Sequence, residues 1–257
     1  MEFLKQEVVN KTAVVTINRP PANALAGAVI TELDQILHDL ETNNDIRVIV
    51  LKGEGRFFSA GADIKEFTSI DSGEKAIELA TNGQKLMDRI ENFPKPIIAS
   101  IHGAALGGGL ELAMSCHIRI VSENAKLGLP ELSLGIIPGF AGTQRLPKYV
   151  GTAKAAEMML TAEPISGVDA VKFGLANVAV PEEDLYEETM KLAKKIETKS
   201  PASIKAVLNL LTYAKTEQFS QGVEAEAKAF GEVFLTEDAK EGVSAFLEKR
   251  QPNFTGN

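Results

Sequence analysis

The sequence predicts an α/β fold with a mostly parallel sheet, followed by a helical C-terminal tail. Two patterns in the 257 residues support this prediction. Up to about residue 180, short runs of branched apolar residues alternate with longer segments in which apolar residues recur every three or four positions. From residue 182 onward we find only the helical spacing and expect no further strand.

The N-terminal segments supply the first elements. Residues 7–9 and 13–18 are short apolar runs, and Arg19-Pro20-Pro21 closes the second because prolines cannot continue a ladder. Apolar residues then recur at spacings of three and four over 25–40, which predicts an amphipathic helix packed on a sheet. The almost continuous branched run at 46–53 predicts a strand buried on both faces.

The middle of the chain repeats this alternation. A second helix is expected over 73–92 and ends before Pro94, which cannot continue it. Residues 97–103 and 117–122 are the next expected strands, and the helix between them begins at the glycines 107–109. Strands separated by helices in this way indicate parallel pairing.

The composition argues against several classes of partner and site. The net charge of −8 comes from mixed acidic and basic residues without a basic block, which argues against nucleic acid or an anionic membrane as the main partner. Cys116 is the single cysteine and forms a poor metal pair with His117, so we expect neither a disulfide nor a metal site. The first ten residues are charged and no apolar run reaches membrane-spanning length, so we expect a cytoplasmic protein.

Two glycine-rich turns, Gly61-Ala62 and Gly107-Gly108, follow predicted buried strands and open into helices. In a parallel sheet such loops emerge at one edge, where two unhindered backbone N–H groups would form an oxyanion hole. Glycines after a strand also serve tight packing. The second turn fits neither the dinucleotide fingerprint nor a phosphate loop. The remaining interpretation is that the backbone N–H groups of this turn closely approach a small, negatively charged group of a ligand.

Two glutamates are candidates for proton transfer near these turns. Glu111 stands three residues after Gly108, about one helical turn inside the helix, although an acidic residue there also favours the helix dipole. Glu131 is flanked by Pro130 and apolar residues, so we expect partial desolvation to raise its pKa. A glutamate on a loop surface is the alternative for Glu131.

Three blocks, in this order and spacing, resemble the enoyl-CoA hydratase (crotonase) family. They are SAGADIKEF, HGAALGGGLELAMSCHIRI and PELSLGIIPGFAGTQRLPKYVG, and the similarity extends to the C-terminal FLTEDAKEGVSAFLEKRQPNF. The resemblance implies a crotonase-type spiral of ββα units with a C-terminal helical oligomerisation region. It divides the chain into a core with the acyl-CoA site, residues 1–199, and a trimerisation region, residues 200–257. It also implies a homo-hexamer built as a dimer of trimers.

The resemblance also implies roles for particular residues of this chain. It implies that the amides of Ala62 and Gly108 form the oxyanion hole for a thioester carbonyl and that Glu111 and Glu131 are the catalytic carboxylates. The Gly139 amide would help to hold a water molecule. The positions expected to line the CoA site are Ala60, Asp63, Ile64, Lys65, Phe230 and Lys249.

These roles imply an enoyl-CoA hydratase, which adds water reversibly and syn to a 2-trans-enoyl-CoA, as in fatty-acid β-oxidation. Coenzyme A would be part of the substrate, so no separate cofactor is expected. An enoyl-CoA isomerase or another acyl-CoA lyase of the family is the alternative, and a non-catalytic acyl-CoA-binding protein is a third. One departure stands out: the family commonly has Pro-Gly-x-Gly-Gly-Thr where residues 138–143 read PGFAGT, which would reshape the acyl pocket.

Overall fold

The computed structural model describes residues 1–67, 71–214 and 236–256. Its strands are β1 (Leu4–Val9), β2 (Thr12–Ile17), β3 (Val48–Gly53), β4 (Ile97–Ile101), β5 (Ala104–Leu106), β6 (Ile118–Ser122), β7 (Lys126–Gly128), β8 (Ile165–Ser166) and β9 (Val178–Val180). Its helices are α1 (Gly27–Thr42), α2 (Ile64–Phe67), α3 (Gly73–Glu91), α4 (Gly108–Ser115), α5 (Gly142–Thr161), α6 (Gly167–Lys172), α7 (Leu185–Glu197), α8 (Pro201–Ala214) and α10 (Glu237–Glu248). Two short 3₁₀ turns are η1 (Glu131–Leu134) and η2 (Glu182–Asp184).

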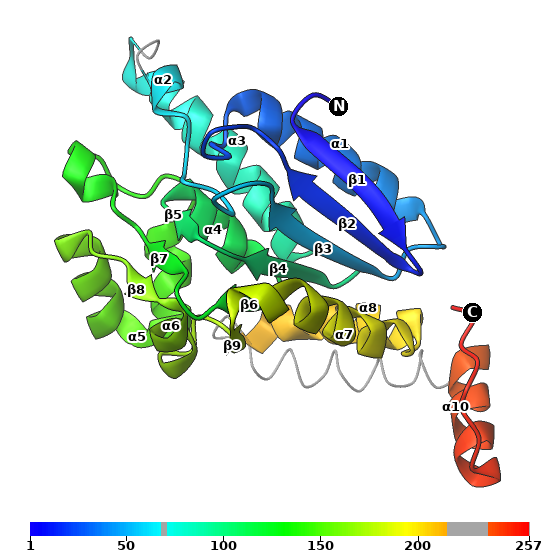
Figure 1. The fold of residues 1–257 in the computed structure, drawn as a ribbon. Helices are drawn as coiled ribbons and strands as arrows, with labels where there is room; N and C mark the ends of the chain where they lie inside the picture. The colour runs from blue at the N-terminus through cyan, green and yellow to red at the C-terminus, as the bar shows by residue number, and fades with distance from the viewer. Residues whose placement is uncertain (68–70, 215–235, 257) are drawn as a thin grey trace.

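The centre of the molecule is a six-stranded sheet in the order β1-β2-β3-β4-β6-β9 (Figure 1). Its strands run parallel except for the antiparallel pair β1 and β2. A smaller sheet has the order β5-β7-β8. The predicted α/β class with mostly parallel pairing is confirmed.

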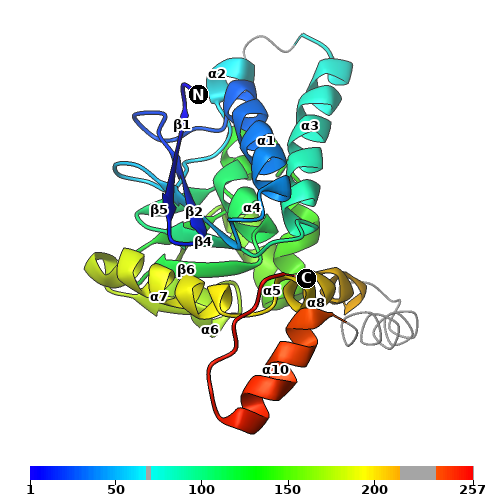
Figure 2. The same cartoon turned by 90° about the vertical axis from the view of Figure 1, so that its right-hand side faces the viewer.

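Helices cover both faces of the large sheet. On one face, α1, α3 and α4 enclose the main apolar core, and Figure 2 shows α1 and α3 side by side. On the other face, α7 buries Leu185 and Ala193 against alternate strand residues such as Val14, Val50 and Ile98. The central strands β2, β3 and β4 are therefore buried on both sides, as the continuous branched runs of β3 and β4 predict, whereas the edge strand β1 is mostly exposed.

Successive turns of the chain add a strand to each sheet in a spiral. β4 leads directly into β5 and then α4, and β6 leads into β7 and then, through η1, into α5. After β3, a bridge between Ser59 and Ala105 adds a further short link to the small sheet. This arrangement is the expected spiral of ββα units, and it places the segment after β3 beside the start of α4.

The strands that the sequence pattern missed are short. β5, β7 and β9 have three residues each and β8 has two, which is too few for an alternating or branched pattern to stand out. Backbone pairing with neighbours, rather than local propensity, defines these strands. The elements expected at 13–18, 25–40, 46–53 and 73–92 are present with bounds shifted by a few residues at most.

The C-terminal elements are less buried than the core. On α8, Val207 and Leu211 are 54% and 52% exposed. The chain returns to the core near its end, where the Arg47 guanidinium donates to the carbonyls of Glu197 and Phe254 at 3.0 and 2.6 Å. None of the helices in the described residues is long and apolar enough to cross a membrane.

A buried guanidinium closes the C-terminal end of α4. The Arg119 side chain donates to the carbonyls of Ala113 and Cys116 at 3.2 and 2.6 Å and to that of Leu175 at 2.7 Å. It also lies 4.4 Å from the centre of the Tyr149 ring. A cation here satisfies carbonyls that the helix leaves unpaired and complements the negative end of its dipole.

We expect Arg119→Met to lower the free energy of unfolding by about 2–4 kcal/mol, because it removes a buried donor from three carbonyls, of which, in the described residues, only that of Ala113 keeps another donor, the Cys116 N–H. Urea titration of both proteins measures the difference. Arg56→Met, at an exposed arginine, is the matched control and should change stability by less than about 0.5 kcal/mol. Equal stability of Arg119→Met and the control would contradict this role.

Candidate active site

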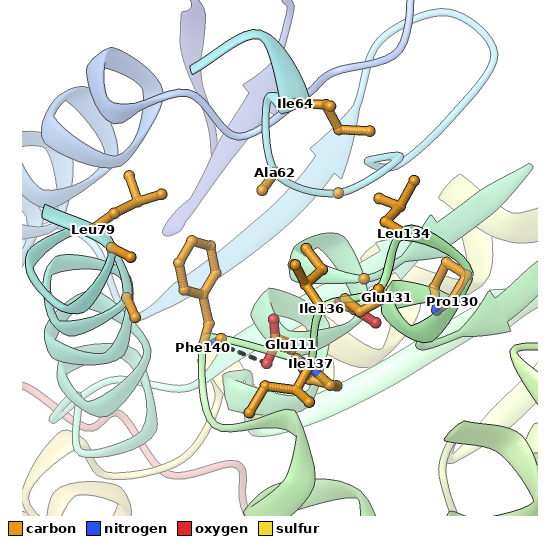
Figure 3. A pocket seen from close by; sticks show the side chains of 18 of the residues that line it. Ala62, Ile64, Leu79, Glu111, Pro130, Glu131, Leu134, Ile136, Ile137 and Phe140 are labelled. Carbon is orange, nitrogen blue, oxygen red and sulfur yellow. Dashed lines mark hydrogen bonds between the residues drawn. The ribbon is translucent and has the colours of Figure 1, made fainter. Parts of the chain in front are cut away.

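A cavity of about 780 Å³ opens between α3, α4, η1 and the turn at residues 60–64 (Figure 3). Its walls are mostly apolar and come from α3 and from the loop that follows η1. The polar groups that face it include the carboxyls of Glu111 and Glu131 and the backbone of both glycine-rich turns. An apolar cleft with a few convergent polar groups is the usual form of a small-molecule site.

Backbone pairing brings the two glycine-rich turns together. The Ser59 N–H donates to the Ala104 carbonyl at 3.1 Å, and the Leu106 N–H donates to the Ser59 carbonyl at 3.0 Å. A Cβ placed on Gly108 would lie only 3.3 Å from the Ala62 nitrogen. Gly108 begins α4, so the helix supplies no acceptor for its N–H. The hydrogen bonds among the described residues use neither this N–H nor that of Ala62, so two donors are available at one cavity.

The turns depend on glycine at particular positions. Gly61 and Gly107 have φ angles of 111° and 50°, in a region that residues with a Cβ rarely adopt. At Gly109, a Cβ would lie 2.4 Å from the Ser59 carbonyl oxygen and would push α4 away from the first turn. Glycine thus allows both the bends and the close approach that the predicted oxyanion hole requires.

An ion pair braces the turn that carries Ala62. The Arg19 guanidinium donates to the Asp63 carboxylate and, at 3.2 Å, to the Ala24 carbonyl. The hydrogen bond from Arg19 lowers the pKa of Asp63, and the Lys65 N–H donates to the same carboxylate at 3.0 Å. Asp63 therefore holds the backbone that follows Ala62.

Glu111 is fixed by two backbone donors. Its Oε1 atom accepts the N–H groups of Phe140 and Gly142 at 2.8 and 2.6 Å. The residue is 1% exposed, and this burial raises the pKa of the carboxyl to about 7 in spite of the two donors. Its other oxygen is directed into the cavity (Figure 3). Glu111 is therefore a buried carboxyl that is held in place through one oxygen and faces the cavity with the other.

Glu131 begins η1 and lines the same cavity. It is 9% exposed, and burial raises its pKa, as expected from the apolar sequence around it. Its Oε2 atom is buried and has no hydrogen-bond partner among the described residues. An unpaired buried oxygen is costly when charged, which favours the protonated form. The alternative of a glutamate on a loop surface is excluded.

Arg145 fixes the loop that holds Glu111. Its guanidinium donates to the Phe140 carbonyl at 3.0 Å and pairs with Asp88 and Glu91 of α3 at 2.6 and 3.0 Å. Its positive charge also acts to lower the pKa of Glu111. Sequence reasoning did not single out Arg145, because its two acidic partners lie more than 50 positions away in the chain.

The departure at residues 138–143 has two structural consequences. The Phe140 ring packs directly on Gly83 of α3, where a Cβ would lie 2.2 Å from the ring. Figure 3 shows the ring rising into the cavity between Leu79 and Glu111. Ala141, where the family commonly has glycine, adopts φ 70°, a left-handed conformation that costs an L-residue about 1–2 kcal/mol.

The positions expected at the CoA site are dispersed. Ala60 and Ile64 line the cavity, and Lys65 is exposed beside it on α2. Asp63 is absent from the cavity wall because Arg19 holds its carboxylate. Lys249 is exposed and follows α10, which lies apart from α2 and α3 in Figures 1 and 2. Phe230 lies outside the described residues.

Of the remaining expected site groups, Gly139 is in the cavity wall and its carbonyl accepts the side-chain amide of Gln84 at 2.9 Å. Within residues 1–67, 71–214 and 236–256, no group of three or more His, Cys, Asp or Glu side chains is arranged to hold a metal ion.

Comparison with known proteins gives consistent results. The family model described as enoyl-CoA hydratase/isomerase matches residues 7–257. The chain is 58% identical to a probable enoyl-CoA hydratase of Bacillus subtilis over 257 residues, covering 100% of both chains. It is 40% identical over 247 residues to the short-chain-enoyl-CoA hydratase of Clostridium acetobutylicum, covering 95% of this chain and 94% of the relative. The crystal structure of an enoyl-CoA hydratase from Bacillus anthracis is similar with a TM-score of 0.95 at 35% identity, covering 99% of this chain and 100% of that one.

The raised pKa of Glu111 predicts a specific pH dependence of stability. Between its ordinary value of 4.5 and about 7, the folded protein binds a proton that the unfolded chain has released. The stability that this proton contributes is therefore fully present below pH 4.5 and is lost as pH rises through 7. We expect Glu111→Gln to avoid this loss and to gain roughly 3 kcal/mol relative to the unsubstituted protein between pH 4.5 and pH 8.

Urea unfolding at a series of pH values measures this gain. Glu163→Gln, at an exposed glutamate, is the control and should leave the pH dependence unchanged. If Glu111→Gln follows the same pH curve as the unsubstituted protein, Glu111 does not hold a proton in the folded state.

Proposed function

This chain belongs to the enoyl-CoA hydratase/isomerase family, and we propose that it adds water reversibly across the C2–C3 double bond of a 2-trans-enoyl-CoA to give a 3-hydroxyacyl-CoA. The observation that supports this proposal most is the convergence of two unused N–H groups, from Ala62 and Gly108, with two buried carboxyls at one cavity. An acyl-CoA thioester would be the substrate. Coenzyme A would enter as part of it, so no separate cofactor is needed.

The two N–H groups would bind the thioester oxygen. When the oxygen of a conjugated thioester is stabilised as an enolate, C3 becomes electrophilic and accepts a water molecule. Each donor of this kind is typically worth about 10²–10³ in rate. Both donors are backbone groups on turns braced by pairing and by the Arg19–Asp63 ion pair, so they need not reorganise during the reaction.

The two carboxyls would divide the proton transfers. The paired donors on Glu111 Oε1 favour its ionised form, whereas Glu131 has an unpaired buried oxygen that favours a proton. We assign Glu111, with the Gly139 amide, to hold the water and take its proton as the oxygen bonds to C3. Glu131 gives its proton to C2, and transfer of one proton from Glu111 to Glu131 restores the starting state. Both groups would act from one side, so the addition is syn.

The cavity wall suggests where the acyl chain lies. The side chains around the Phe140 ring are apolar, and they include Leu79 and Ala80 of α3 and Ile136 of the loop after η1. An acyl chain extending from the hole would contact these groups. The reaction class that would supply the substrate is oxidation of a saturated acyl-CoA at C2 and C3, as in fatty-acid β-oxidation.

We further propose a homo-oligomer, a hexamer built as a dimer of trimers. The support is the exposed apolar surface of α8, where Val207 and Leu211 are more than half exposed. In such an assembly Lys249 would approach the CoA site of a neighbouring subunit, the role that the resemblance also implies for Phe230.

We expect Glu131→Gln and Glu111→Gln each to lower kcat with crotonyl-CoA by about 10²–10⁴-fold, because each removes one proton-transfer group. Loss of the absorbance of the conjugated thioester measures hydration. Glu157→Gln, at an exposed residue of α5, is the control and should retain full activity.

Undiminished turnover in both glutamine variants would contradict the mechanism. A 3-enoyl-CoA substrate tests the reaction class, since migration of its double bond without uptake of labelled water would instead identify an isomerase. Binding of enoyl-CoA esters of several lengths without turnover of any would identify a non-catalytic acyl-CoA-binding protein.

A further inference from the structure

One face of α3 contacts the loop that holds Glu111. Gln84, Asp88 and Glu91 occur at spacings of four and three, so they share a face of the helix. Asp88 and Glu91 bind the Arg145 guanidinium, and the Gln84 side-chain amide donates to the Gly139 carbonyl at 2.9 Å. Gln84 is the member of this set that reaches the cavity wall.

Gln84 donates its hydrogen bond to the peptide group that joins Gly139 and Phe140. The carbonyl of Gly139 and the N–H of Phe140 belong to the same planar peptide group. Its oxygen accepts Gln84 Nε2 at 2.9 Å, and its N–H donates to Glu111 Oε1 at 2.8 Å. The two hydrogen bonds therefore form a chain from α3 through one peptide to the carboxylate. Bonds in such a chain polarise and strengthen one another.

We propose that Gln84 is a positioning residue that holds the Gly139–Phe140 peptide so that its N–H stays aimed at Glu111 and favours the ionised carboxylate. This inference rests on the proposed function, because it assigns to Gln84 the control of the group that activates water. Gln84 acts through the peptide and is not itself assigned contact with the reacting atoms.

The ionised form of Glu111 is stabilised mainly by backbone N–H donors, because the charges around it largely offset one another. Glu131, across the cavity on η1, acts to raise the pKa of Glu111, and Arg145 of α5 acts to lower it. Arg145 is also engaged by Asp88 and Glu91 of α3, which offset its positive charge. The N–H groups of Phe140 and Gly142 are thus the direct hydrogen bonds to the Glu111 carboxylate, and Gln84 fixes the peptide of the first.

The consequence is a pH effect of definite sign. Without the donor of Gln84, the Gly139–Phe140 peptide loses the restraint on its carbonyl, and its N–H bond to Glu111 weakens. A carboxylate that loses a donor to its charged form has a higher pKa. The ionised base is then lost at a higher pH, so activity falls most on the acidic side.

Gln84→Met tests this inference, since methionine has similar length and shape but no N–H donor. We expect the acidic limb of kcat against pH, with crotonyl-CoA, to move upward by about half to one pH unit. The KM should change less than kcat at pH 6, and kcat at pH 9 should stay within a few-fold of the unsubstituted enzyme. Gln144→Met, at an exposed glutamine beside the same loop, is the control with no shift expected.

A second readout does not depend on activity. In protein with ¹³C-labelled glutamate side chains, the carboxyl signal of Glu111, assigned by its loss in Glu111→Gln, should titrate at a higher pH in Gln84→Met. If the unsubstituted protein fails to hydrate any enoyl-CoA, the proposed function is wrong, while this titration still tests Gln84.

An unmoved pH profile, an equal loss of kcat at every pH, or an unchanged Glu111 titration would overturn the inference. Should Gln84→Met fail to fold, Gln84→Ala removes the same donor without adding bulk. The expectation for that variant and the results that contradict it are the same.

Discussion

The site depends on the backbone pairing that joins the segment after β3 to β5. Two hydrogen bonds of Ser59, with Ala104 and Leu106, bring the first turn beside the start of α4. The N–H groups of Ala62 and Gly108 come together as a result, and no acceptor in the described residues uses either of them. Two adjacent donors without a protein acceptor can both donate to one ligand atom at the cavity. The spiral creates this arrangement because each turn of the chain contributes to both sheets.

The two cavity carboxyls, Glu111 and Glu131, differ in the contacts that set their pKa values. Glu111 is more buried than Glu131 but has two backbone donors, whereas Glu131 has an oxygen without a partner. Burial raises both pKa values. Two loop N–H groups act against it at Glu111, whereas at Glu131 only the backbone of Glu131 itself donates a hydrogen bond that acts against it. Two interacting carboxyls with raised pKa values lose their protons as a pair rather than independently. The loop at 139–142 and its contacts with α3 therefore help to set the protonation of Glu111.

The sequence supplied the larger elements of the fold and the central groups of the cavity. Long apolar patterns are strong signals, so the main strands and helices could be predicted, as could the placement of Glu111 one turn into a helix. The short strands β5, β7, β8 and β9 depend on pairing partners elsewhere in the chain and carry no local pattern. The ion pairs of Arg145 with α3, the bond from Gln84 to Gly139 and the ion pair of Arg19 with Asp63 could not be predicted for the same reason, because each joins residues 44 or more positions apart. Asp63 matched a CoA-lining position by motif, but its partner could be known only from the fold.

The central claim is that Ala62 and Gly108 donate to one thioester oxygen. Infrared difference spectroscopy of bound butyryl-CoA with a ¹³C-labelled thioester carbonyl measures this directly, because the saturated chain cannot be hydrated. Two hydrogen bonds polarise the carbonyl, so its stretching band is predicted at a lower frequency than in water. A band at the frequency found in water, or above it, would contradict the account.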